Sequence, residues 1–365
     1  MGGNLRVHGI GPSLIETKTT DMKSFVWSIR NLLRSIDEKF SDGDESRMIW
    51  PRGIENYIAG SFSHFASADR MHLQSLSEII PSINDIDVLV NRDCFVHFCQ
   101  FICMNETFGL FEKIGQSSSK TSQLSVMFKI PNDRPGPDHF FVQVDFIAAD
   151  FENDLPTEWE RFAHSSSIDD LKLGIKGVFH KLLLGSIDFA GKHQAYLIER
   201  SETKNAFAKL TKIHDHAFSV LHGVRKKYQQ ETSIGGIPMV RALKKPEYVY
   251  VNDVPSIIKI LFGLDDFPTQ DQIYTCHSFV GLTKAIKHTF NSNRIGRLHI
   301  LEAFTDRIFG FRAQKLNNDL TKDREIKFRA LNYLISELKM DDSCRTEMNE
   351  EVAKKFYEKY FQTAG

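Results

Sequence analysis

The stretch Asn84-Asp85-Ile86-Asp87-Val88-Leu89-Val90 decides the fold, because it reads as a short strand that begins with two acids. Side chains alternate along a strand, so Asp85 and Asp87 share one face, while Ile86 and the valines face a core. Two carboxylates side by side repel each other, and a divalent cation is the usual compensation. The stretch therefore predicts a cation-binding strand.

A third acid has the same setting further along the chain. Asp145 lies in the apolar run Phe140-Phe141-Val142-Gln143-Val144-Asp145-Phe146-Ile147, on the face opposite Val142, Val144 and Phe146. The loop-forming sequence Pro131-Asn132-Asp133-Arg134-Pro135-Gly136-Pro137 separates this run from an earlier one at 123–130. We predict that the two runs form a hairpin, which places Asp145 on a strand adjoining the cation site.

A glycine and a serine precede the acids. Ile58-Ala59-Gly60-Ser61-Phe62 ends an apolar stretch with Gly-Ser, where backbone amides can approach a phosphate. A plain tight turn is the other interpretation of this dipeptide.

The ordered set of Gly-Ser, Asp-x-Asp and a distant single Asp resembles the nucleotidyltransferase superfamily, which has the polymerase-beta-like fold. The resemblance covers roughly residues 50–185. It implies that Asp85, Asp87 and Asp145 are catalytic and bind two Mg²⁺ ions, which Mn²⁺ could replace. It also implies that Gly60 and Ser61 contact the phosphates of an NTP. The chain departs from the family pattern in the long segment between Ser61 and Asp85.

Further nucleotide-binding residues are predicted near these motifs. Ser63 is close enough to Ser61 in sequence to join the phosphate site, and so is His64. Lys172, Lys176 and His180 recur every four residues, which predicts one stripe on a helix over 168–184. The resemblance implies that Lys176 and His180 reach the nucleotide, whereas a solvated face is the ordinary reading of such a stripe.

Composition bounds the class of protein. The chain has 365 residues, 41% of them hydrophobic and 25% charged, with a formal net charge of −1. A dedicated non-specific nucleic-acid binder is more basic, so RNA could bind only through a local patch. Candidates for such a patch are Lys172, Lys176, Lys181, Arg225, Lys226, Lys227, Lys244 and Lys245.

Cysteines and hydropathy indicate the compartment. Five cysteines in a chain of this length predict free thiols rather than a disulfide framework. Cys94, Cys99 and Cys103 could hold zinc, but burial as small apolar residues is the favoured reading. No apolar run is long enough for a transmembrane helix, and the first twenty residues contain no signal-peptide core. We therefore expect an intracellular, cytoplasmic protein with no membrane partner.

The coarse pattern predicts an α+β protein with two domains. Residues 1–190 form a nucleotidyltransferase-like domain, in which a mixed sheet carries the acids and residues 1–20 are loose. Residues 191–365 form a mostly helical domain, with helices expected at 21–40, 69–80 and 94–109 in the first half and at 254–262, 272–290, 295–309, 322–339 and 346–361 in the second.

The function expected from these features is Mg²⁺-dependent transfer of an NMP from an NTP to a hydroxyl. A nucleic-acid 3′ end, RNA above all, is the favoured acceptor. Alternatives are synthesis of an oligonucleotide or cyclic second messenger, nucleotidylylation of a protein, or modification of a small molecule. Two other classes stay open: a non-catalytic binding or scaffold protein of the same fold, and a metallohydrolase that uses His214-Asp215-His216.

Overall fold

The structure is a computed structural model that divides the chain into two compact units, Met1–Lys172 and Leu173–Gly365. The sequence places the boundary near residue 190, and contacts within the structure place it after Lys172. The structure describes residues 15–69, 72–104, 111–116, 123–131, 139–187, 216–219, 223–227, 230–234, 237–241, 248–251, 253–264, 266–290, 294–309 and 324–339.

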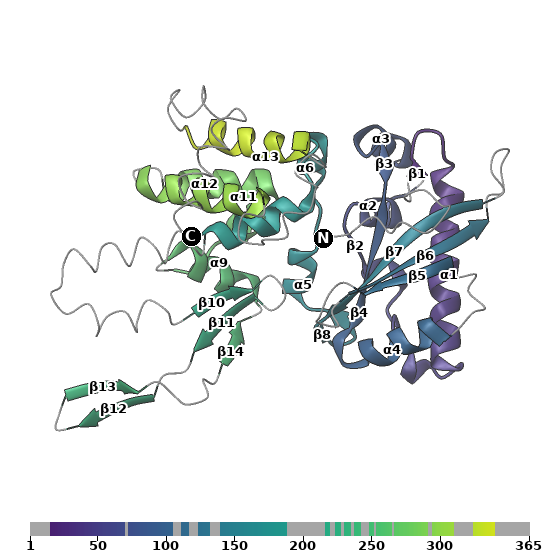
Figure 1. Cartoon of the computed structure of the whole chain (residues 1–365), viewed down its shortest axis with the longest axis horizontal. Helices are drawn as coiled ribbons and strands as arrows, with labels where there is room; N and C mark the ends of the chain where they lie inside the picture. Colours follow the sequence, from purple (N-terminus) through teal and green to yellow (C-terminus); the bar gives the residue numbers. More distant parts are fainter. Residues whose placement is uncertain are drawn as a thin grey trace, which may run out of the picture. The chain divides into compact units, whose positions relative to one another are not determined.

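The first unit is built on a five-stranded mixed sheet with strand order β2-β4-β7-β6-β5 (Figure 1). The strands are β2 (Ile58–Ala59), β4 (Asp85–Asn91), β7 (His139–Ala149), β6 (Gln123–Pro131) and β5 (Phe111–Gln116). β4 and β7 are parallel, and every other neighbouring pair is antiparallel. The α+β class and the predicted hairpin of β6 and β7 are thereby confirmed.

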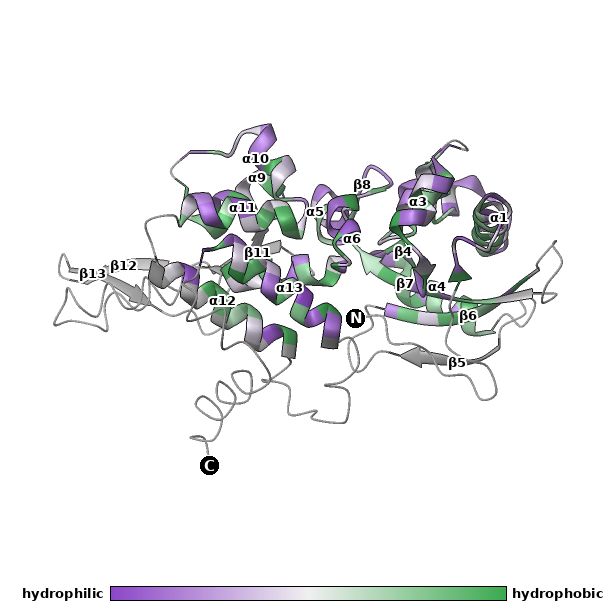
Figure 2. Cartoon of the chain, turned by 90° about the horizontal axis from the view of Figure 1, so that it is seen from above, coloured by the Kyte–Doolittle hydropathy of each residue, from purple (hydrophilic) through white to green (hydrophobic). Residues whose placement is uncertain are grey.

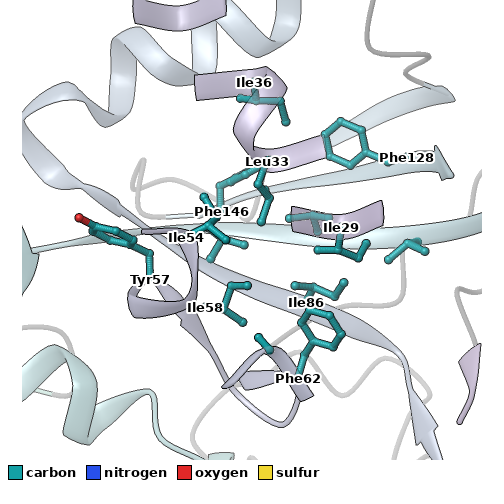
Figure 3. Close-up of a cluster of buried hydrophobic side chains, with 14 of the residues drawn as sticks. Ile29, Leu33, Ile36, Ile54, Tyr57, Ile58, Phe62, Ile86, Phe128 and Phe146 are labelled. Atoms are coloured by element: carbon teal, nitrogen blue, oxygen red, sulfur yellow. The ribbon is translucent and has the colours of Figure 1, made fainter. Parts of the chain in front are cut away.

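Two long helices cover the apolar face of this sheet. They are α1 (Met22–Ser41) and α4 (Arg92–Met104), close to the predicted 21–40 and 94–109. Figure 3 shows Ile29 and Leu33 of α1 against Ile86 of β4 and Phe146 of β7. From α4, the ring of Phe98 lies 4.9 Å from that of Phe146 in an edge-on contact.

The amphipathic pattern of α1 explains why it forms. Its buried residues recur at three- and four-residue intervals, and Figure 2 shows the helix carrying both hydrophobic and hydrophilic residues. Asp42 terminates the helix: its backbone is left-handed, and its amide donates a hydrogen bond to the carbonyl of Glu38 in the last turn. Asp21 precedes the helix as predicted, although its carboxylate accepts a hydrogen bond from the Ser24 hydroxyl rather than from a backbone N–H of the helix.

Short elements complete the first unit. The segment 1–20 was expected to be loose, but Ile15–Glu16 forms strand β1 and pairs with β3 (Ser82–Ile83). Burial of Ile15 in the core accounts for this order. The remaining elements are η1 (Glu45–Arg47), η2 (Ile54–Asn56), α2 (Ser63–Ser67), α3 (Leu73–Ile79), β8 (Phe151–Glu152), β9 (Leu155–Pro156), α5 (Glu158–Ala163) and α6 (Ile168–Lys172).

The second unit is mostly helical, as predicted, and also contains strands that the sequence did not reveal. Its helices are α9 (Val254–Phe262), α10 (Gln270–Thr275), α11 (Phe279–Thr289), α12 (Arg294–Phe309) and α13 (Arg324–Glu337). Its strands are β10 (His216–Ser219), β11 (Gly223–Lys227) and β14 (Tyr248–Val251) in one sheet, and β12 (Gln230–Ile234) and β13 (Ile237–Arg241) in a hairpin.

One predicted helix of the second unit is divided. The pattern at 272–290 becomes α10 and α11, because Ser278 caps a new helix by accepting the amide of Gly281. The helix predicted at 346–361 lies outside the described residues. Within the described parts of the chain, none of the helices has the length and apolar character needed to span a membrane.

Candidate functional site

Four polar side chains form a block on the sheet face opposite α1 and α4. Asp85 of β4 is the register partner of Gln143 of β7, and Asp87 is the partner of Asp145. Register partners on neighbouring strands project to the same face, as do residues two apart on one strand. The structure therefore brings the three predicted acids together, with Gln143 at the fourth corner. We call these four residues the acidic block.

Asp145 is the most buried member of the block. Its side chain has no exposed surface, whereas Asp85 and Asp87 are half-buried. The Gln143 amide Nε2 donates a 2.8 Å hydrogen bond to Asp145 Oδ1, and Oδ2 has no hydrogen-bond partner among the described residues. Burial raises the pKa of Asp145, and the neighbouring side chains of Ser125 and Gln143 oppose that rise.

The Gly60 turn lies directly against this block. Gly60 follows β2, whose Ala59 is the register partner of Asp87, and its backbone is left-handed with φ of 64°. A Cβ atom at position 60 would lie 2.6 Å from Asp87 Oδ2. Only glycine therefore allows the turn to approach the carboxylate this closely.

Of the residues predicted to contact phosphate, Gly60 and Ser63 are hydrogen-bonded within the protein, whereas Ser61 has no hydrogen bond to a described residue. The Gly60 amide donates to the carbonyl of His164 (3.1 Å), and the Ser63 hydroxyl donates to the carbonyl of Gly60 (2.8 Å). These two groups hold the turn itself. Ser61 is half-buried, and no described residue hydrogen bonds with its hydroxyl or amide. Ser61 is thus the member of the turn that has polar groups to offer a ligand.

The segment 164–166 fastens this turn from behind. Besides the bond from the Gly60 amide, the ring nitrogen Nε2 of His64 lies 2.5 Å from the carbonyl oxygen of Ser166. Burial lowers the pKa of His64, so the neutral ring donates its N–H to that carbonyl. His64 is therefore a structural residue of the turn, which does not support the expectation that it joins a phosphate site.

A polar cluster that the sequence did not reveal ties the two acid-bearing strands together. Arg92 directly follows β4 and Asp150 directly follows β7, and Arg92 Nε lies 2.5 Å from Asp150 Oδ1. The buried carboxylate of Glu160 lies 3.5 Å from the Arg92 guanidinium and accepts the Asp150 amide. The sequence signal for this cluster is that one acid-bearing strand is followed directly by an arginine and the other by an aspartate, two residues of opposite charge to each other.

The predicted stripe of Lys172, Lys176 and His180 is wrong, because no single helix carries these residues. α6 ends at Lys172, a turn follows at 173–174, Lys176 lies in neither a helix nor a strand, and His180 belongs to a helical segment at 177–187 of the other unit. Gly174 breaks the pattern with φ of 68°, and the Arg329 guanidinium occupies the space where a side chain would be. The close approach expected at this glycine thus comes from the chain itself.

His180 is a core residue of the second unit, which contradicts its predicted role in nucleotide binding. Its side chain is buried and its Nε2 lies 2.7 Å from the carbonyl oxygen of Cys276. Burial lowers the pKa of His180 to about 4, so the ring is neutral at physiological pH. Lys176 is half-buried and has an interaction within the described residues.

The donor chemistry of the acidic block suits a metal ion, although its described side chains are not placed as a metal site. No group of three His, Cys, Asp or Glu side chains in the described ranges is arranged as a ready metal site. Carboxylate oxygens are nevertheless the donors that Mg²⁺ and Mn²⁺ prefer. Asp145 Oδ2 is a buried oxygen with no hydrogen-bond partner among the described residues, so it is an available ligand beside Asp87.

The other predicted sites are covered only in part. His214, Asp215, Lys244 and Lys245 lie outside the described residues, and so do the side chains of Arg225–Lys227 on β11. Cys94 and Cys99 are half-buried free thiols, whereas Cys103 is exposed and departs from the expectation of burial.

Comparisons of the chain with protein-family models, with curated proteins and with solved structures found no match.

Proposed function

We propose that this protein is a metal-dependent nucleotidyltransferase, which moves an NMP from an NTP to a hydroxyl group and releases pyrophosphate. The observation that carries the proposal is the register of the two parallel strands, which sets Asp87 beside Asp145 with Asp85 on the same face. The approach of the Gly60 turn to Asp87 adds a backbone loop at the place where phosphates would bind.

The three carboxylates differ in burial, and we assign them different roles in the proposed reaction. Asp85 and Asp87 are half-buried and would hold Mg²⁺, or Mn²⁺ in its place, together with the triphosphate. Asp145 is fully buried and its pKa is raised, so its carboxylate is a stronger base than an exposed one. Asp145 would hold a second cation through Oδ2, where that cation could activate the attacking hydroxyl.

The Gly60 turn would contribute binding rather than proton transfer. The Ser61 hydroxyl and amide would donate to phosphate oxygens, while Gly60 and Ser63 keep the turn in place through their bonds to His164 and to each other. The bound Mg²⁺ would neutralise the charge that develops on the phosphates during transfer. A nucleic-acid 3′ end, preferably of RNA, is the acceptor to test first.

The test is transfer from α-labelled NTPs in the presence of Mg²⁺, with RNA, with free nucleotide and with the protein alone. Transfer with release of pyrophosphate supports the proposal, and the labelled product identifies the acceptor. Asp87→Ala should abolish transfer without unfolding the chain, because the side chain lies outside the core. Asp93→Asn is the matched control, because Asp93 is an exposed acid on α4.

Two results would count against the proposal. Release of inorganic phosphate without transfer of label would indicate a hydrolase. Absence of any turnover, with nucleotide binding that Asp87→Ala leaves unchanged, would indicate a binding or scaffold protein. Asp93→Asn should behave as the unaltered protein in every arm.

A further inference from the structure

Gln143 occupies the fourth corner of the acidic block. It lies on β7 two residues before Asp145 and opposite Asp85 on β4. Its side chain is 1% exposed. The amide group is therefore enclosed between a carboxylate on its own strand and the position of a second carboxylate on the neighbouring strand.

The surroundings of Gln143 on its other side are apolar. Its register partner on β6 is Met127, which is completely buried. An aliphatic side chain of similar size would pack there without the loss of hydration that a buried amide incurs. Packing therefore does not explain why a glutamine stands at this position.

The hydrogen bond to Asp145 does explain the glutamine. Gln143 Nε2 donates to Asp145 Oδ1 over 2.8 Å, which fixes the rotation of the carboxylate and leaves Oδ2 as its other oxygen. A lysine would supply a donor too, but its positive charge would compete with a cation. A fourth carboxylate would add to the repulsion. An amide stabilises the ionised form of Asp145 and leaves the negative charge of the block intact.

We propose that Gln143 is a positioning residue of the cation site, whose amide holds Oδ1 of Asp145 so that Oδ2 serves as the metal ligand. The inference rests on the proposed nucleotidyltransferase function, and it identifies how this chain prepares its third acid. Partners that orient a metal ligand typically matter 10- to 100-fold for metal affinity.

The experiment uses Gln143→Met, which keeps the length of the side chain and removes the donor. Binding of Mn²⁺ to the full chain is followed by electron paramagnetic resonance of the free ion. We expect the Mn²⁺ dissociation constant to rise about 10- to 100-fold near neutral pH. Val142→Ala is the matched control, because Val142 is the fully buried neighbour on the opposite face of β7. It should affect stability and leave Mn²⁺ binding unchanged.

A second measurement does not depend on metal. The carboxyl carbon of Asp145 is titrated by nuclear magnetic resonance, with Asp145→Asn to assign its signal. Asp85 and Asp87 of β4 and the side chains of Ser125 and Gln123 of β6 share its face and stay the same in the variant. We expect Gln143→Met to move the Asp145 midpoint to higher pH. Gln143→Glu, which keeps the shape of the side chain, should move it in the same direction.

The outcomes separate this inference from the proposed function. If the unaltered protein binds Mn²⁺ and Gln143→Met changes neither that binding nor the Asp145 midpoint, Gln143 has no positioning role although the function stands. If the unaltered protein neither binds Mn²⁺ nor transfers a nucleotide, the function is overturned, and the role of Gln143 toward a cation is overturned with it. Weaker Mn²⁺ binding together with a raised midpoint supports both.

Discussion

Asp145→Asn should make the protein more stable while it removes activity. The asparagine keeps the shape of the side chain and an oxygen that accepts from Gln143. Its amide can also donate to the carboxylate of Asp87, the register partner. The substitution thus replaces a buried charge beside a second acid with a neutral group that has partners on two sides.

The sign and magnitude follow from burial. Asp145 has a pKa raised by desolvation, so the folded state binds its proton more tightly than the unfolded state does. Stability is therefore lost as pH rises from the unfolded pKa through the higher folded pKa of Asp145. A buried polar group without a partner costs about 1–3 kcal/mol, and Asp145→Asn should recover about that amount at pH 7.

The assay is thermal unfolding from pH 4 to pH 8 in the presence of a chelator. A gain of about 1–3 kcal/mol in a unit of this size corresponds to a rise of about 2–12 °C in Tm. The gain should shrink as pH falls through the folded pKa of Asp145, because the native carboxyl then takes up its proton. Added Mg²⁺ should stabilise the native protein only. A variant that is less stable at pH 7, or a difference that does not vary with pH, would refute the reasoning. Asp93→Asn serves as the exposed control.

Three further predictions concern residues outside the acidic block. Gly60→Ala should lower stability by about 1–3 kcal/mol and weaken Mn²⁺ binding, because it combines backbone strain with a 2.6 Å approach to a carboxylate. Gly43→Ala, at φ of 76° with open space around it, should show the strain alone. The free energy of unfolding of the native protein should fall by about 3 kcal/mol as pH falls from 6.5 to about 4, because the unfolded state protonates His180 first. Denaturant unfolding of His180→Gln should show no such fall. Arg92→Met should cost about 3–5 kcal/mol in chemical denaturation, since it removes the guanidinium beside the buried Glu160. Loss of the exposed Arg52, which lies 3.8 Å from Asp154, should cost less than about 1 kcal/mol.

The sequence was informative where one strand or helix decides the outcome. Alternation alone indicated which side chains of 84–90 and 140–147 share a face, and three- and four-residue spacing indicated α1 and α9. The pairing of Asp87 with Asp145 could not be read in this way. Register depends on contacts between residues far apart in the chain, and a shift of one residue would turn Asp145 into the core.

The failures also have local causes. The predicted stripe of Lys172 and His180 did not allow for Gly174, which has a left-handed backbone and whose absent side chain leaves room for the guanidinium of Arg329 on α13. The sequence at β10 and β11 does not decide between strand and helix, because β11 contains Arg225-Lys226-Lys227, a charged run that lacks the apolar alternation of a half-buried strand.

The hydrogen bond from the Gly60 amide to the carbonyl of His164 makes hydrogen exchange at this amide a measure of how the turn opens. That amide proton exchanges with water when the segment after α5 moves away, and at high pH, where every opening leads to exchange, its exchange rate equals the rate at which the turn opens. Turnover slower than this opening would leave chemistry or product release as the slow step. Turnover at the same rate as the opening would mean that admission of the nucleotide sets the pace of the reaction.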